Sequence, residues 1–175
     1  DPTNVLFELT SHVQDSVCKD AVNALVDRDP QNLRKLFPLL EDSRLHIRRL
    51  ICGHLGKRVN PLAEELLLDY LKHRRFQLKD RQHILACYRA LGQCGSARSL
   101  PFLQESLLKQ DWKSFLGIGG SLHRQGAALA LLAMRNEEAA RSTLQKASRS
   151  IFSGGRLADR RAVEEDQNMK KEAGR

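Results

Sequence analysis

The two side chains best placed for chemistry in this sequence are His83 and Cys87. Residues four apart share one face of a helix, so an imidazole and a thiol at this spacing could reach the same metal ion. Two ligands do not make a zinc site, however, and we favour the interpretation of a helix histidine beside a buried cysteine. We therefore expect no metal and no cofactor in this chain.

The positions of the cysteines in the sequence indicate free thiols and not disulfides. None of the cysteines belongs to a C-x-x-C pair, and all lie in segments with helical patterns. They are Cys18, Cys52, Cys87 and Cys94. This distribution predicts core residues of a protein in a reducing compartment, and we expect a cytoplasmic location.

A glycine-rich run, Gly117-Ile118-Gly119-Gly120, could cradle a phosphate group, because successive backbone N–H groups bind anions and a helix is expected to follow. No strand precedes the run, and no lysine stands where a phosphate loop requires one. The alternative is an insertion in a repeat, which costs little because loop closure depends weakly on length. The sequence also lacks G-x-S-x-G, so we predict no catalytic residue and favour a non-enzymatic protein.

The same segment contains the only tryptophan of the chain. Asp111, Trp112 and Phe115 fall between helical patterns, in the part of the sequence that departs most from regular repetition. Apolar rings in a loop either fold back onto the protein or contact a partner, and irregular loops often carry binding. We keep both interpretations and name these three residues as the candidate partner-binding loop.

The residues named above must be positioned by helices, and the sequence predicts that these helices form hairpins. Apolar residues recur at helical spacing, as at Leu33, Leu36, Phe37 and Leu40, and a leucine followed by a tight turn recurs at Leu25, Leu55, Leu91 and Leu132. We predict five hairpins, at about 3–27, 31–58, 61–93, 98–135 and from 137 onward. The fold class is therefore all-α, an α-α superhelix over residues 1–152, with residues 153–175 as a polar capping helix or tail.

Caps and prolines set the expected helix boundaries. Asp29 and Asn60 each precede a proline, a pattern typical of a helix start, because the side chain caps free N–H groups and proline needs no donor in the first turn. Pro38 and Pro101 lie within apparent helices. Each should remove a backbone hydrogen bond and bend its helix.

The residues around these turns resemble a known family. Ala90-Leu91-Gly92-Gln93-Cys94-Gly95-Ser96-Ala97, followed by Leu100-Pro101-Phe102-Leu103, is similar to the turn and first helix of HEAT and phycobilisome-lyase HEAT-like repeats. Ile47-Arg48-Arg49 through Leu55-Gly56 resembles a second helix. The resemblance covers about residues 15–150. It implies a solenoid, and it leaves open a scaffold or regulatory module, a DNA-repair protein or a chromophore lyase.

The net charge of +8 is concentrated in the middle of the chain, where residues 45–95 contain ten Lys or Arg and four Asp or Glu. In HEAT arrays the second helix of each hairpin generally lines the concave face. The arginines expected there are Arg48, Arg49, Arg81, Arg89 and Arg124. They could follow phosphates, as in HEAT-like DNA glycosylases, or they could be solvated or bonded to neighbouring helices. The His-Glu pairs that hold a dimetal centre in some HEAT-like relatives are absent.

The expected partner is a protein, with nucleic acid as the alternative. No run of residues reaches the length and apolar content of a membrane span, so we predict no membrane insertion. The chain begins at Asp1, without an initiator methionine. We expect it to be part of a longer, perhaps bacterial, protein whose further domains are themselves possible partners.

Overall fold

Short polar side chains cap the predicted helix starts in the computed structural model. The Asp29 carboxylate accepts a hydrogen bond from the backbone N–H of Gln31 (2.9 Å). The Asn60 side-chain oxygen accepts one from the N–H of Leu62 (3.0 Å). A proline follows each cap, as predicted. Local sequence therefore decides where these helices begin.

The structure describes residues 2–74, 80–108, 122–134 and 138–149. Every regular element within these ranges is a helix, which confirms the all-α fold class. The α-helices are α1 (Pro2–Leu9), α2 (Asp15–Arg28), α3 (Leu33–Leu36), α4 (Leu45–Gly56), α5 (Pro61–His73), α6 (Arg81–Cys94), α7 (Leu100–Leu108), α9 (Leu122–Ala133) and α10 (Glu138–Arg149). The 3₁₀ helices are η1 (Pro30–Asn32), η2 (Phe37–Glu41) and η4 (Ala97–Ser99).

The predicted hairpins match the described helices closely. The first four correspond to α1–α2, η1–α4, α5–α6 and η4–α9, and α10 begins the fifth. The predicted boundary between array and tail, at residues 152 and 153, lies outside the described residues. A membrane span is not among the described helices, because none is both long and apolar enough to cross a bilayer.

Neither proline bends a helix as predicted. Before Pro38 the α-helix ends, since α3 stops at Leu36 and the chain continues as the 3₁₀ helix η2, in which Pro38 is the second residue. Pro101 is the second residue of α7, where the missing N–H would have had no partner within the helix. The sequence pattern placed both prolines too far inside their helices.

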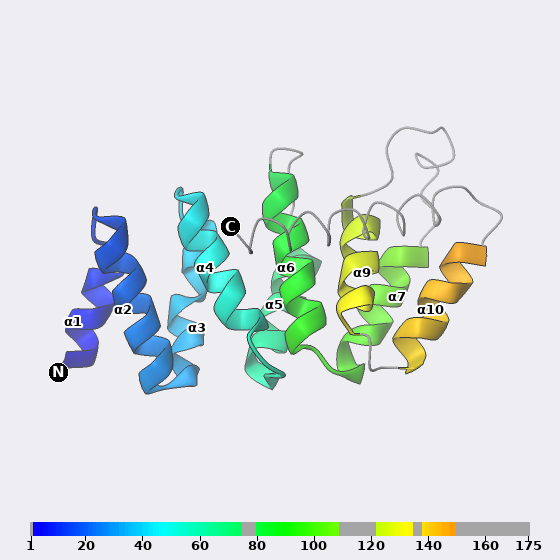
Figure 1. Cartoon of the computed structure of the whole chain (residues 1–175), viewed down its shortest axis with the longest axis horizontal. Helices are drawn as coiled ribbons and strands as arrows, with labels where there is room; N and C mark the ends of the chain where they lie inside the picture. The colour runs from blue at the N-terminus through cyan, green and yellow to red at the C-terminus, as the bar shows by residue number, and fades with distance from the viewer. Residues whose placement is uncertain (1, 75–79, 109–121, 135–137, 150–175) are drawn as a thin grey trace.

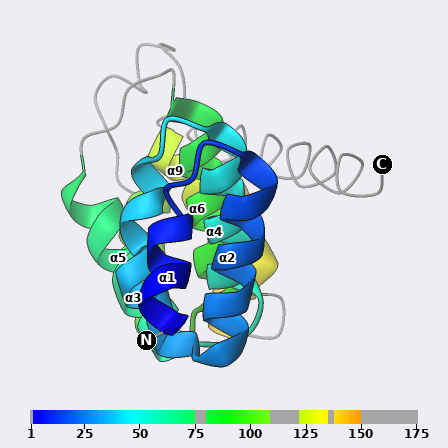
Figure 2. The same ribbon diagram turned by 90° about the vertical axis from the view of Figure 1, so that its left-hand side faces the viewer.

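The hairpins stand in a row and form two layers. Figure 1 shows the helices side by side along the long axis, and Figure 2 shows α1, α3 and α5 in one layer with α2, α4 and α6 in the other. Within the second layer α4 packs on α6, and α6 on α9. One continuous apolar core runs from Cys18 to Ala140 between the layers. Each hairpin thus completes the core of its neighbour.

Glycines allow the second-layer helices to approach closely. A Cβ atom at Gly92 of α6 would lie 2.3 Å from the carbonyl oxygen of Ala130 in α9. At Gly56 of α4 it would lie 3.1 Å from the Cα of Ala90 in α6. Both distances are shorter than a normal carbon contact, so only glycine fits at this helix separation.

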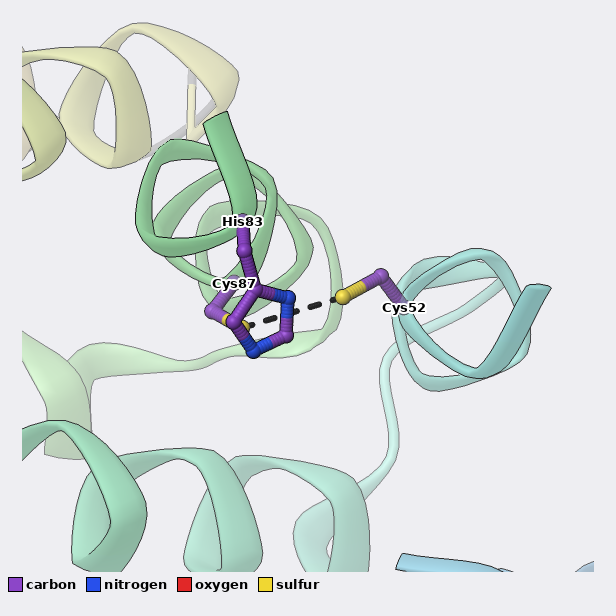
Figure 3. Close-up of side chains that lie close together, drawn as sticks. All are labelled: Cys52, His83 and Cys87. Carbon is purple, nitrogen blue, oxygen red and sulfur yellow. Dashed lines mark hydrogen bonds between the residues drawn. The ribbon is translucent and has the colours of Figure 1, made fainter. Parts of the chain in front are cut away.

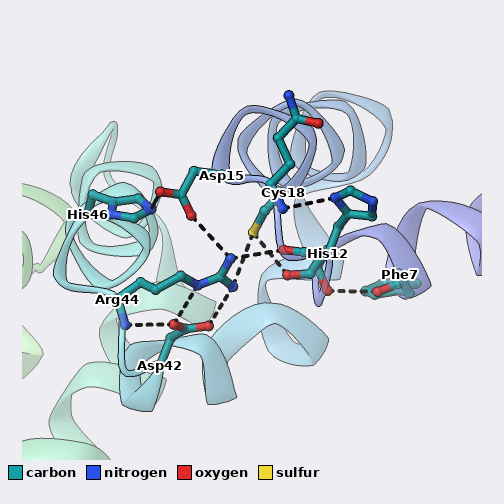
Figure 4. Close-up of polar contacts among 9 residues, drawn as sticks. Phe7, His12, Asp15, Cys18, Asp42, Arg44 and His46 are labelled. Carbon is teal, nitrogen blue, oxygen red and sulfur yellow. Dashed lines mark hydrogen bonds and ion pairs between the residues drawn. The ribbon is translucent and has the colours of Figure 1, made fainter.

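Arg44 joins the first two hairpins at their turns (Figure 4). Its guanidinium donates hydrogen bonds to both oxygens of Asp42 (3.0 and 2.9 Å) and to the carbonyl oxygen of His12 (3.0 Å). It also forms an ion pair with Asp15, at 3.4 Å. The hydrogen bonds from Arg44 lower the pKa of the Asp42 carboxyl group. The planar guanidinium can bind several acceptors at once, which suits it to tie two turns together.

Candidate functional site

The predicted partner-binding loop, formed by Asp111, Trp112 and Phe115, lies outside the described residues, as does the glycine run 117–120. What the structure does describe are the residues on either side, Leu108 at the end of α7 and Leu122 at the start of α9.

Two of the predicted basic residues bond to neighbouring helices. Arg49 of α4 is exposed and donates a hydrogen bond to Gln82 of α6 (3.2 Å). Arg81 of α6 is exposed and donates one to Gln125 of α9 (3.2 Å). These contacts link successive second-layer helices, which is one of the two roles expected for the arginines.

The remaining arginines are less accessible. Arg48 and Arg89 are half-buried, and the Nε atom of Arg48 is buried without a hydrogen-bond partner. Arg124 is only 5 % exposed, so its side chain belongs to the interior and not to the basic surface on which we expected it. It precedes Gly126, whose missing Cβ lets α9 lie against the Tyr88 ring of α6 and brings this turn of α9 into the core.

The strongest concentration of reactive groups is a cluster of Cys52, His83 and Cys87 (Figure 3). One ligand atom from each residue lies within 4.8 Å of the other two. The two sulfurs are 3.7 Å apart, and Cys87 Sγ is 3.8 Å from His83 Nε2. The side chains are 6 %, 4 % and 0 % exposed in the order named. No other such group was found within the described residues.

Two helices build this cluster. His83 and Cys87 lie one turn apart on α6, as the sequence predicted, and Cys52 reaches them from α4. The close approach of Gly56 to Ala90 holds α4 and α6 together one turn further along. The contact that requires glycine therefore also brings the two thiols together.

The pKa values of the two thiols in the cluster are shifted in opposite directions. The hydrogen bond between Cys52 and Cys87 is the main cause that lowers the pKa of Cys52 to about 6. Burial opposes this shift, and His83 and Arg48 contribute to it. The same hydrogen bond, with burial, raises the pKa of Cys87 well above the ordinary value of a thiol. The two thiols therefore titrate as a coupled pair and not as independent groups.

Tyr70 of α5 fixes the imidazole from the other layer. Its hydroxyl oxygen lies 3.0 Å from His83 Nε2 and donates a hydrogen bond to Glu41 (2.5 Å). The two rings also meet edge to face, with centroids 6.1 Å apart. Because Tyr70 is itself held by Glu41, the His83 ring has little freedom to turn away from the sulfurs.

The sequence identified two members of this cluster and missed the third. Cys52 is 31 residues before His83, so no local spacing connects them. The repeat offers a signal: when Leu55-Gly56 is aligned with Leu91-Gly92, Cys52 falls opposite Tyr88, next to Cys87. Cys52 of α4 and Cys87 of α6 thus lie at nearly the same level of successive second-layer helices.

Comparison with known proteins identifies no family for this chain. The chain matches no protein-family model, and a search of curated proteins finds no match. The resemblance to HEAT-like repeats therefore stays an interpretation of the residues, and the functional proposals below rest on the geometry.

Proposed function

We propose that this chain is a non-enzymatic protein-interaction module built from HEAT-like repeats, acting as a scaffold or regulatory part of a larger protein. The observation that carries the proposal is an edge of the array with exposed apolar side chains. We call it the turn edge and define it by residues 10–14, residues 42–45 and the helix ends at Leu108 and Leu122. Figure 1 shows these turns and ends together along the upper edge.

Apolar side chains are exposed along the turn edge at three places. Val13 is 93 % exposed between α1 and α2, and Leu45 and Leu108 are also exposed. Covering such groups with a partner releases water from apolar surface, at about 25 cal/mol per Å². Trp112 and Phe115 fall between Leu108 and Leu122 in the sequence, outside the described residues. We infer that a protein partner binds here.

An affinity-capture experiment tests the turn edge. A variant with Val13→Ser, Trp112→Ala and Phe115→Ala should lose most of the partner that the unchanged chain recovers from cells of its source. The matched control is Val59→Ser, since Val59 is also an exposed valine but lies in the α4–α5 turn at the opposite edge. The control should retain capture, and circular dichroism should be unchanged in both variants. Equal recovery by all three chains would overturn the proposal.

Nucleic acid is the second candidate partner. It is favoured by Arg49 and Arg81, exposed on neighbouring helices in the basic middle of the chain. A labelled duplex titrated at two salt concentrations should bind less tightly at the higher one, and Arg49→Gln with Arg81→Gln should flatten that dependence. Absence of binding at low salt rejects this function.

A further inference from the structure

We propose that Cys52, His83 and Cys87 form a Zn²⁺ site that joins α4 to α6, with a fourth coordination position left for a further ligand. This inference goes beyond the proposed interaction function and is independent of it. Two features of the cluster support it, namely its spacing and its donor chemistry.

The spacing of the donor atoms matches a tetrahedral zinc site. With Zn–S bonds of about 2.3 Å and Zn–N bonds of about 2.0 Å, tetrahedral geometry separates two sulfurs by about 3.8 Å and a sulfur from a nitrogen by about 3.6 Å. The observed Cys52–Cys87 sulfur distance is 3.7 Å, and Cys87 Sγ lies 3.8 Å from a His83 nitrogen. Cys87 therefore stands at a tetrahedral spacing from both other ligands, and the ligand atoms of Cys52 and His83 lie within 4.8 Å of each other.

The donor set selects the class of metal. Two sulfurs and one imidazole nitrogen are borderline-to-soft ligands, which Zn²⁺ accepts and which Mg²⁺ and Ca²⁺ do not favour. Binding requires both cysteines as thiolates, so any proton that the pair still holds leaves to solvent as the Zn–S bonds form.

A hydrogen bond of His83 would be exchanged when the ion binds. The Tyr70 hydroxyl lies 3.0 Å from His83 Nε2, the same nitrogen that faces Cys87 Sγ, and donates to Glu41. Zinc bound at Nε2 would take the place of the Tyr70 contact, and Tyr70 would keep its hydrogen bond to Glu41. A zinc ion here would bridge the second and third hairpins, adding a coordination link to the packing and hydrogen bonds that already join them.

Zinc titration of the whole reduced chain tests the site. With a competing chromogenic chelator, the unchanged chain should take up one Zn²⁺. Cys52→Ser and His83→Asn should each weaken binding by on the order of 100-fold or more, beyond the 10- to 100-fold typical of losing only a supporting partner. The matched control is Cys94→Ser, because Cys94 is a buried cysteine on the same helix α6 but outside the cluster. The control should bind as the unchanged chain does.

Co²⁺ substitution keeps the test valid if a variant fails to fold. The unchanged chain with one Co²⁺ should show thiolate-to-metal charge transfer together with tetrahedral ligand-field bands. Zn²⁺ should also raise the melting temperature of the unchanged chain. The proposal is overturned if the reduced chain takes up no stoichiometric Zn²⁺, if Co²⁺ gives no thiolate band, or if Cys94→Ser weakens binding as much as Cys52→Ser. Isolation of a Cys52–Cys87 disulfide from a chain that binds no metal when reduced would assign a redox pair instead.

Discussion

Glu64 shows how a single buried charge can be made stable. Its carboxylate on α5 is buried and accepts hydrogen bonds from the hydroxyl of Ser99 (2.5 Å) and from the backbone N–H and hydroxyl of Ser96 (3.0 and 3.2 Å). These donors belong to the turn before α7, so Glu64 ties the third hairpin to the fourth. Removing the charge should therefore loosen the join between two hairpins.

We expect Glu64→Gln to lower the free energy of unfolding by about 2 kcal/mol at pH 7, because hydrogen bonds to a charged group contribute about 1.5–3 kcal/mol. Glu65→Gln is the control. Glu65 is half exposed, and its ion pair with Arg34 spans 3.5 Å at the surface, so its loss should cost little. Urea titration of both variants measures the difference, and equal effects would contradict the role assigned to Glu64.

The effect of Glu64 should depend on pH. Burial alone raises the pKa of Glu64, but the hydrogen bonds from Ser99 and Ser96 outweigh burial and lower it. A carboxyl group whose folded pKa is lowered stabilises fully above its unfolded pKa, about 4.3, and loses this contribution as pH falls through the folded pKa. The stability difference between the unchanged chain and Glu64→Gln should thus be constant from pH 7 to about 5 and shrink below about pH 4. A difference that stays constant to pH 3 would count against this.

At the scale of helices, glycine sets the spacing of the second layer. Gly92 faces the backbone of α9, and Gly56 faces that of α6. Backbone atoms cannot move aside as a flexible side chain can, so the helices must separate if a methyl group is added.

We therefore expect Gly92→Ala to destabilise the fold by about 1–3 kcal/mol despite the higher helix propensity of alanine. The control is Gly53→Ala, since Gly53 is an exposed glycine within α4 and its added Cβ would have no atom within 4 Å. That change should stabilise by up to about 1 kcal/mol. Thermal unfolding of both variants decides the point, and a neutral Gly92→Ala would mean that α6 and α9 are further apart than described.

At the scale of the whole molecule, burial is distributed unevenly along the row. Nine residues of α6 are buried, whereas α1 has none. In a repeat array each unit is stabilised by its neighbours, and α6 packs against both α4 and α9 in its own layer. The interior of the row should therefore be its most stable part.

Hydrogen exchange followed by mass spectrometry should reflect this gradient. Amides of α6 should exchange on the slowest timescale, near that of global unfolding, and amides of α1 should exchange many-fold faster, because few buried contacts oppose local opening. Equal protection of the two helices would mean that the array unfolds as a single cooperative unit.

Sequence alone determined the helical hairpins. Apolar residues at helical spacing, such as Leu33 and Leu36, and capping residues such as Asp29 and Asn60 act within a few positions along the chain. Interactions of this range can be read directly from the residues. They predicted the fold class and hairpin boundaries, but they misplaced Pro38 and Pro101, because local patterns do not show where an α-helix yields to a 3₁₀ turn.

The tertiary structure alone decided which distant residues meet. Arg124 looked like a surface residue because its charge is visible in the sequence, whereas the packing of α9 on α6 buries it. Cys52 looked like an ordinary core residue, yet the close approach of α4 and α6 places its sulfur 3.7 Å from that of Cys87. Helix separation and rotation depend on contacts summed over both layers, so a cluster between helices appears only when the whole array is assembled.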